Sequence, residues 1–372
     1  MALRAASQLV RSLPVPVAGP ASVQVSVIRK GRERMQSSRH LARFSGVAAL
    51  GLVALLGLAA CGGSSSARAS SAAGAATSAS PVAVTAGNGP FLSNADLYLT
   101  KQKGYFSRNG LTVTIATLSA GANAVPQLLN DSMQFAAVDM PTAITAVAHH
   151  VPITIVAPNT VGSPGPIGYA GVVTLGSSDI KTASDLIGKT VAVNQLNGTA
   201  EILVKAYLDH ASIDWKQVKF VQVAPPQFLA TLQSHHADGA VFGEPLITIA
   251  KSMGMRLLFN LEQTTVPNQA TFVYIAAKSY VAAHPAAVQA FVSALLKGQV
   301  QASANPDLVR EIAKTSTQIA PKLLAAVTLP TFGGKPVVEA DVQKWIDLMV
   351  KYGGLSQDQA PKASDVLVPV GS

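Results

Sequence analysis

The sequence predicts an α/β protein of two lobes, each a mostly parallel sheet flanked by helices, followed by a C-terminal helical segment. From Pro81 onward, short β-branched runs alternate with longer helical patterns, and this unit of alternation occurs twice. About 290 residues follow this point, and 49% of the whole chain is apolar, which suffices for two lobes of ordinary domain size.

The first series of elements predicts strands and helices in alternation. Strands are expected at 82–85, 111–115, 135–138 and 151–156, and helices at 95–106, around 127–130 and at 141–149. Pro141 fits the first position of its helix, where a missing N–H costs nothing. Strands separated by crossover helices pair in parallel, which favours an α/β sheet.

The second series repeats the pattern. Strands are expected at 171–175, 190–193, 218–221, 239–242 and 271–276, helices at 183–187, 200–210, 226–234 and 245–252, and a largely helical tail at 281–352. The tail is expected to pack back on the first lobe. The first lobe would comprise residues 81–173 and 272–372, the second 174–271, with hinges near 173–175 and 271–273.

Residues 1–60 have the pattern of a secretory leader, and Met35 is an alternative start. Arg39 and Arg43 precede an uncharged apolar run of 15 residues, shorter than the roughly 20 that a membrane-spanning helix needs. The run ends in Leu-Ala-Ala directly before Cys61, which resembles the bacterial lipobox. Residues 61–80 would then be a lipidated cysteine and a flexible Ser/Ala-rich linker. The alternative is an uncleaved signal anchor followed by an ordinary cysteine.

The net charge of +9 is concentrated in the leader. Residues 1–60 hold eight basic residues and one acidic residue, and the remaining chain holds 20 basic and 18 acidic residues. Without a basic stripe, nucleic-acid binding is not predicted. Cys61 is the single cysteine, so no second cysteine exists for a disulfide, a thiolate metal site or a cysteine nucleophile.

Six segments stand out along the chain, in this order: 95–106 with its Gly-Tyr-Phe ending, 109–113, 134–139, 151–157, 180–193 and 242–245. Together they resemble periplasmic solute-binding proteins that serve uptake of nitrate, taurine, alkanesulfonates and thiamine-type pyrimidines. The resemblance implies a type II periplasmic-binding-protein fold and an exported lipoprotein of an ABC importer, anchored to the outer face of the cell membrane. It also implies a small-molecule ligand, permease and ATPase partners, a monomer, and neither an enzyme nor a cofactor.

Two rival functions remain open at this point. One is an enzyme on the same fold, similar to pyrimidine-precursor synthases, which depend on a cysteine-rich motif and a cytosolic location that this sequence does not show. The other is a sensor or surface lipoprotein without a transport role.

The candidate ligand-binding residues follow predicted strands, where helix N-termini present free N–H groups. They are Asn88, Phe91, Ser119, Gly121, Asn123, Asp139, Thr142, Asn194, Asn197, Gly198, Thr199, Phe242 and Glu244. Each polar residue is also a good cap or turn former, and the phenylalanines also fit a core. Five such junctions would share one edge if the strands are parallel, which favours a site.

The charges of these junctions predict the character of the ligand. No arginine occurs between Thr112 and Met255, whereas Asp139 and Glu244 could hold an amine or a heterocyclic N–H. A neutral, zwitterionic or amine-bearing ligand is therefore expected to bind better than a bare inorganic anion. The pairs His149–His150 and His235–His236 are interpreted as solvated helix C-termini rather than metal ligands.

Replacing Cys61 with serine tests the predicted lipid anchor. A serine hydroxyl cannot accept the thioether-linked lipid, so Cys61→Ser should accumulate as a larger, unprocessed chain and lose the part of its membrane attachment that depends on the lipid. Cell fractionation with immunoblotting measures both effects, and Ser64→Ala in the linker serves as the control. A variant as membrane-bound and as fully processed as the parent would contradict the lipoprotein prediction.

Overall fold

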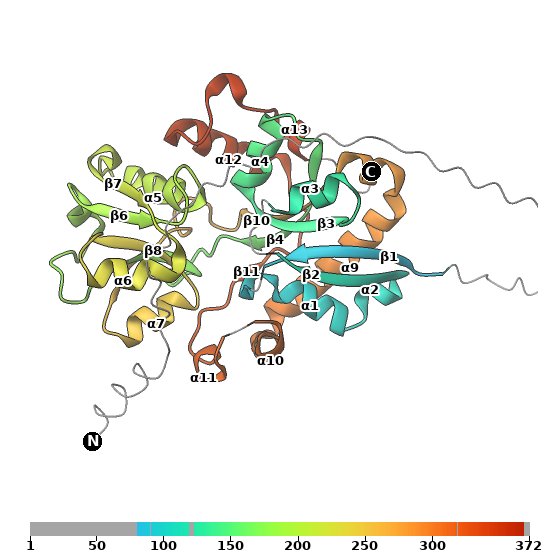
Figure 1. Cartoon of the computed structure of the whole chain (residues 1–372), viewed down its shortest axis with the longest axis horizontal. Coiled ribbons are helices and arrows are strands. Elements are labelled where there is room, and N and C mark those ends of the chain that lie inside the picture. Colours follow the sequence, from blue (N-terminus) through green and yellow to red (C-terminus); the bar gives the residue numbers. More distant parts are fainter. Residues whose placement is uncertain (1–79, 90, 119–122, 318, 368–372) are drawn as a thin grey trace, which may run out of the picture. The chain divides into compact units, whose positions relative to one another are not determined.

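The computed structural model describes residues 80–89, 91–118, 123–317 and 319–367 (Figure 1). All of them belong to one compact unit, residues 74–372. The predicted leader, Cys61 and residues 61–79 of the linker lie outside the described residues. Among the helices of the described part, none combines the length and the apolar character needed to cross a membrane.

The first sheet has six strands, drawn from both ends of the described chain. They are β1 Val82–Asn88, β2 Leu111–Thr117, β3 Phe135–Asp139, β4 Ile153–Val161, β10 Ala270–Ala277 and β11 Thr331–Phe332. Their order in the sheet is β11-β4-β10-β3-β1-β2. β1 pairs in parallel with β2 and β3, whereas β10 runs antiparallel to β3 and β4, and β11 antiparallel to β4.

The second sheet has five strands from the middle of the chain. They are β5 Ala170–Thr174, β6 Thr190–Val193, β7 Lys219–Gln222, β8 Gly239–Gly243 and β9 Arg256–Asn260. Their order is β7-β6-β8-β5-β9, with β6 parallel to β7 and β8, and β5 antiparallel to β8 and β9. Figure 1 shows this sheet in yellow and green with its own helices.

Helices flank both sheets. Their bounds are α1 Ala95–Gln102, α2 Tyr105–Arg108, α3 Ala124–Leu129, α4 Met140–Ala148, α5 Thr199–His210, α6 Phe228–Gln233, α7 Leu246–Ser252, α8 Lys278–Ala283, α9 Pro285–Ala304, α10 Pro306–Ser316, α11 Pro321–Leu324, α12 Glu339–Tyr352 and α13 Ala363–Val366. The first sheet with α1–α4 and α8–α13 is called the first lobe, and the second sheet with α5–α7 the second lobe.

The predicted α/β class and two-lobed architecture are confirmed, and the sheets are mixed rather than mostly parallel. The strands that follow the two crossings, β5 and β10, run antiparallel to their neighbours, and the short edge strand β11 runs antiparallel to β4. The helical tail packs on the first lobe as expected: the Phe291 ring of α9 stacks on the Phe135 ring of β3 with centroids 3.8 Å apart.

The predicted lobe boundaries differ from the observed strand pairing. Residues 170–173, assigned from sequence to the first lobe, pair within the second sheet as part of β5. Residues 270 and 271, assigned to the second lobe, belong to β10 of the first sheet. The crossings are therefore the segments 162–169 and 261–269, which lie between strands of different sheets. The predicted hinge positions, 173–175 and 271–273, lie at the end of β5 and within β10, and the hinge itself stays a prediction.

The two crossing segments are bonded to each other. The Gly162 N–H donates to the Gln269 carbonyl at 2.9 Å, and the Asn268 N–H donates to the Gly162 carbonyl at 2.8 Å. A Cβ at Gly162 would lie 2.1 Å from the Val266 carbonyl oxygen, so only glycine allows this approach. The buried carboxylate of Glu262 accepts the Ser163 N–H at 3.0 Å, and burial raises the pKa of Glu262 to about 7.

A buried polar network fixes the chain that follows β1. The Asp96 carboxylate accepts hydrogen bonds from Gln299 Nε2 at 2.9 Å and from the Tyr274 hydroxyl at 3.1 Å. Asn159 Nδ2 donates to the Ser93 carbonyl at 2.8 Å. Burial raises the pKa of Asp96 to about 7, against the lowering effect of its donors. Helices α1 and α9 and strands β4 and β10 thus hold the loop after β1 in place.

The raised pKa of Glu262 predicts a pH dependence of stability. The folded state binds the Glu262 proton more tightly than the unfolded state, so the free energy of unfolding should fall as pH rises from about 4.5 to about 7. Glu262→Gln keeps an acceptor for Ser163 but cannot ionise. Its stability relative to the parent should rise by up to about 1.4 kcal/mol per pH unit in this interval. Urea unfolding at pH 5, 6, 7 and 8 measures the difference.

The exposed Glu339→Gln is the control and should leave the pH profile of the parent unchanged. If Glu262→Gln and the parent show parallel profiles from pH 5 to pH 8, Glu262 ionises in the folded protein as it does in water.

Candidate functional site

Each sheet contains one point where the order of its parallel strands reverses. The chain runs from β1 to β2 and then returns past β1 to β3, and likewise from β6 to β7 and then to β8. The carboxyl ends of such strands flank a crevice in which α/β proteins bind ligands. In the first lobe this edge carries Asn88 and Asp139, and in the second it carries residues 194–199 and Glu244. The predicted junctions therefore do share strand edges within each lobe.

Asp139 joins these two edges. It is the N-cap of α4, and its carboxylate accepts the Thr142 N–H at 3.0 Å and the Thr142 hydroxyl at 2.8 Å. The same carboxylate accepts the hydroxyl of Thr199, at the start of α5 in the second lobe, at 3.0 Å. The structure thus brings together Asp139, Thr142 and Thr199, which the sequence placed in one site.

The turn before α5 presents amides beside this contact. Asn197 has a φ of 56°, a left-handed conformation that asparagine tolerates better than most residues, and its N–H donates to the Glu201 carboxylate at 2.8 Å. The side chains of Asn194 and Asn197 are exposed, whereas Gly198 is buried. The turn thus exposes two amide side chains at the N-terminus of a 12-residue helix.

Asn88 is a polar group of the candidate site whose side chain has no partner among the described residues. Its side chain is 0% exposed at the end of β1, and neither its Oδ1 nor its Nδ2 has a hydrogen-bond partner within that part of the chain. A buried amide without partners costs roughly 1 to 3 kcal/mol. An unpaired amide of this kind has a carbonyl oxygen that can accept hydrogen bonds and an NH2 group with two N–H donors.

Glu244 is a helix cap, as Asp139 is. Its carboxylate accepts the N–H and the hydroxyl of Thr248 in α7 at 3.1 and 2.9 Å, and the Thr328 N–H at 3.1 Å. Both predicted acids are therefore satisfied by three donors of the protein. The expectation that they hold an amine of the ligand stays a prediction, since a carboxylate with three donors can accept one more hydrogen bond.

The two phenylalanines of the predicted site have different environments. Phe242 is fully buried in the core of the second lobe and stacks on Phe228 with ring centroids 5.5 Å apart. Its contact with a ligand stays a prediction. Phe91 is 55% exposed just after β1 and stays a candidate. Asn123 precedes α3, while Ser119 and Gly121 lie outside the described residues.

Sequence reasoning missed Glu201 and Lys205, which lie in the first turns of α5. They are 5% and 7% exposed and form an ion pair of 2.6 Å. Their spacing of four residues on a predicted helix was the available signal. It does not distinguish a surface pair from a buried one, so their contact with the turn could not be read from the sequence.

The histidine pairs lie at helix ends, as predicted. His149 follows α4 directly, and His235 follows α6 by one residue with a φ of 57°. Within the described ranges, no group of three or more histidine, cysteine, aspartate or glutamate side chains is arranged to hold a metal ion.

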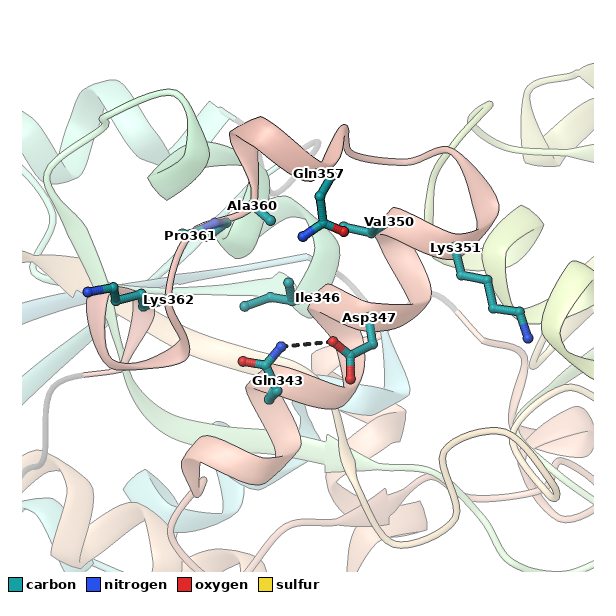
Figure 2. A pocket seen from close by; sticks show the side chains of 9 residues that line it. All are labelled: Gln343, Ile346, Asp347, Val350, Lys351, Gln357, Ala360, Pro361 and Lys362. Atoms are coloured by element: carbon teal, nitrogen blue, oxygen red, sulfur yellow. Dashed lines mark hydrogen bonds between the residues drawn. The ribbon is translucent and has the colours of Figure 1, made fainter.

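A pocket of about 370 Å³ lies on α12 and does not include the predicted site (Figure 2). Its lining consists of Gln343, Ile346, Asp347, Val350, Lys351, Gln357, Ala360, Pro361 and Lys362. Gln343 donates to Asp347 at 2.8 Å, and the Lys351 side chain extends away from the pocket in Figure 2, to Asp209. None of the candidate residues lines this pocket.

Solved structures with the same fold are periplasmic binding proteins. The aliphatic sulphonate binding protein SsuA from Escherichia coli has a TM-score of 0.63 at 19% identity, over 77% of this chain and 96% of that chain. The nitrate-binding protein NrtA from Synechocystis PCC 6803 has a TM-score of 0.60 at 16% identity, over 77% of this chain and 86% of that chain. The class of fold is therefore that of the periplasmic binding proteins.

Residues 93–308 match the NMT1/THI5-like family, which is more than half of the chain, and the protein belongs to this family. The taurine-binding periplasmic protein of Escherichia coli strain K12 is 27% identical to it over 212 residues. That alignment covers 55% of this chain and 62% of the relative, so the chain spans less than two thirds of the relative's length.

A double-mutant cycle tests the contact between the lobes. Asp139→Ala removes the α4 cap and should cost about 1 kcal/mol or more, and Thr199→Val removes only the cross-lobe bond. The two effects should be non-additive by about 0.5 to 1.5 kcal/mol, the net worth of one hydrogen bond. Urea unfolding of the four proteins measures the coupling. Thr231→Val in α6 replaces Thr199→Val in the control cycle, where the effects should add; equal coupling in both cycles would show that the Asp139–Thr199 bond contributes nothing.

Proposed function

We propose that the protein is the solute-binding component of an ABC importer and captures a small organic molecule between its lobes. The observation that carries this proposal is the buried, unpartnered amide of Asn88 at the strand edge where Asp139 meets Thr199. A ligand that forms hydrogen bonds with this amide offsets the cost of burying it unpaired. The amide is already ordered in the folded protein, so little conformational entropy is lost when the ligand binds.

The proposed mechanism is capture by binding, without chemistry on the ligand. The first lobe contributes Asn88, and the second contributes the exposed amides of Asn194 and Asn197 together with the N-terminus of α5. Excluding water from such a crevice strengthens each polar contact, because the local dielectric constant falls. Contacts shared by both lobes make ligand affinity depend on their relative position, which is what a carrier that loads and unloads requires.

The class of ligand that we propose is neutral or zwitterionic. The arginines of the described chain are engaged outside the crevice: Arg256 with the Ile180 and Gly176 carbonyls, Arg310 with the Leu324 and Val327 carbonyls, and Arg108 over the Tyr105 ring. Two carboxylates, Asp139 and Glu244, lie at the strand edges and repel a bare anion. A zwitterion can place its anionic end toward the α5 N-terminus, whose partial charge is positive.

Export and anchoring complete the proposal. The leader pattern of residues 1–60 and the Leu-Ala-Ala-Cys61 ending support a lipoprotein on the outer face of the membrane, delivering its ligand to a permease as a monomer. The names of the similar proteins support binding rather than catalysis. They include a ligand-binding component of an ABC-type import system from Staphylococcus aureus, with a TM-score of 0.65 at 14% identity.

A thermal-shift screen followed by calorimetry tests the binding function. Taurine, an alkanesulfonate, nitrate, amino acids and a thiamine-type pyrimidine are compared with buffer, since a ligand that binds only the folded state raises its melting temperature. We expect a zwitterionic or neutral compound to give the largest shift. A shift confined to nitrate would overturn the ligand class, and no shift from any of the compounds would count against the binding function.

Asn88→Leu separates ligand binding from stability. Leucine resembles asparagine in shape and carries no polar group, so the ligand-free variant should be as stable as the parent or more stable by about 1 to 2 kcal/mol. The affinity for the ligand found in the screen should fall at least tenfold. The control Asn109→Leu removes an amide bonded to the Tyr105 carbonyl at 2.8 Å and should lower stability without changing affinity. Parental affinity in Asn88→Leu would place the ligand elsewhere.

A further inference from the structure

We propose that Glu201 and Lys205 are a positioning pair that holds the ligand-facing turn of residues 194–198 and ties it to the C-terminal end of α12. That the turn faces a ligand rests on the proposed function, whereas the contacts by which the pair holds the turn do not depend on any ligand. Neither residue is assigned a contact with the ligand.

Glu201 acts on the turn directly. One carboxylate oxygen accepts the Asn197 N–H at 2.8 Å, and the other pairs with the Lys205 ammonium at 2.6 Å. Asn197 is left-handed, a conformation that is costly for a residue with a Cβ unless contacts enforce it. The Glu201 bond supplies such a contact and sets the direction in which the turn leads into Gly198 and Thr199.

Lys205 links Glu201 to the end of α12. Its ammonium donates to the Tyr352 carbonyl at 2.9 Å, the last residue of α12, where the helix dipole is negative. The ammonium also lies over the Trp215 ring at 4.8 Å and near the Phe220 ring at 5.6 Å. These contacts fix the position of the Lys205 ammonium, which in turn fixes the Glu201 carboxylate that it pairs with.

The end of α12 also touches the turn itself. A Cβ at Gly354 would lie 2.9 Å from Ile202 Cδ1 and 3.2 Å from the Asn197 carbonyl oxygen, so the chain after α12 packs directly on the turn. The Tyr352 hydroxyl donates to Asp209 of α5 at 2.8 Å. Earlier in α12, Trp345 Nε1 donates to the Ala270 carbonyl of β10 at 2.8 Å. Helix α12 is therefore bonded to both lobes.

The desolvation energy needed to bury the Glu201–Lys205 ion pair indicates that the pair has a role besides packing. Burying two charges requires a desolvation energy that their attraction often only balances, and apolar residues of similar volume serve packing as well or better. A buried glutamate that also bonds the Asn197 N–H is suited to fix one backbone geometry. The turn is thereby organised before a ligand arrives, which reduces the entropy lost on binding.

Hydrogen exchange in the ligand-free protein tests the inference. In Glu201→Ala the Asn197 N–H loses its acceptor, and exchange in the peptide covering residues 194–199 should become at least tenfold faster. In the double variant Glu201→Gln with Lys205→Met, glutamine keeps an acceptor and no buried charge remains, so exchange there should stay within threefold of the parent. The control Glu311→Ala removes an exposed acid paired with Lys314 on α10 and should change nothing in this peptide.

Comparing hydrogen exchange at 194–199 with the free energy of unfolding separates an effect on the turn from an effect on the whole fold. Urea unfolding gives the global change, and exchange in β6 and β8 should follow it, whereas exchange at 194–199 should exceed it in Glu201→Ala. If Glu201→Ala does not fold, Gly354→Ala takes its place, because its new Cβ presses on the Asn197 carbonyl and should also speed exchange there. Two results would overturn the inference. In the first, exchange at 194–199 in Glu201→Ala or Gly354→Ala changes only as much as global stability does. In the second, exchange in the double variant is as fast as in Glu201→Ala.

The affinity for taurine, measured by calorimetry, tests whether the pair also affects ligand binding. If the parent protein binds taurine, Glu201→Ala should weaken binding at least tenfold and the double variant less than threefold. Equal affinities of Glu201→Ala and the parent would overturn the effect on binding. A parent that fails to bind taurine bears on the proposed ligand class alone, since the exchange experiment still decides whether the pair positions the turn.

Discussion

The backbone bonds between the two crossing segments, 162–169 and 261–269, determine the arrangement of the remaining elements. Because the chain leaves the first sheet after β4 and returns to it as β10, both crossings must lie close together, and the close approach at Gly162 makes this possible. The strands that the crossings lead into, β5 and β10, run antiparallel to both of their neighbours, and β10 joins β4 to the sheet as β5 joins β9. The crossings lie at the carboxyl ends of β3 and β8, where Phe272 pairs with Asp139 and Ala170 pairs with Gly243.

Carboxylates support the structure in two different ways. Asp139 and Glu244 cap helices, and each of their oxygens accepts hydrogen bonds from protein donors. Asp96 is surrounded by donors yet so deeply buried that its pKa is raised to about 7, and Glu262 has the same raised pKa with a single backbone donor. The donors around a carboxylate therefore do not decide its ionisation alone, because desolvation opposes them and wins at both buried positions.

Helices and strands were predicted well where neighbouring residues determine the structure, and poorly where pairing between distant strands determines it. Residues 190–193 form a strand with the predicted bounds, since their β-branched run lies between turn formers. Strand β9 was missed because Arg256 and Asn260 at its ends obscure a pattern whose apolar residues become meaningful only beside β5. The 3-10 turn at Ala183–Leu186 was expected as an ordinary helix, but it ends after four residues. Mixed sheets could not be foreseen because strand direction is not a local property.

The candidate site shows the same division more sharply. That Asp139 caps a helix is readable from Asp-Met-Pro-Thr, and that Phe242 could belong to a core was an open alternative, yet their surroundings depend on distant residues, Thr199 and Phe228. Asn88 looked like any polar residue in a turn, and its lack of partners among the described residues emerges only from their placement in the structure. A residue that matters because its polar group is left unpaired has no local signature in the sequence. In the proposed site the partner of this amide is a ligand, which the sequence does not encode, and this is why such a residue is hard to recognise from sequence.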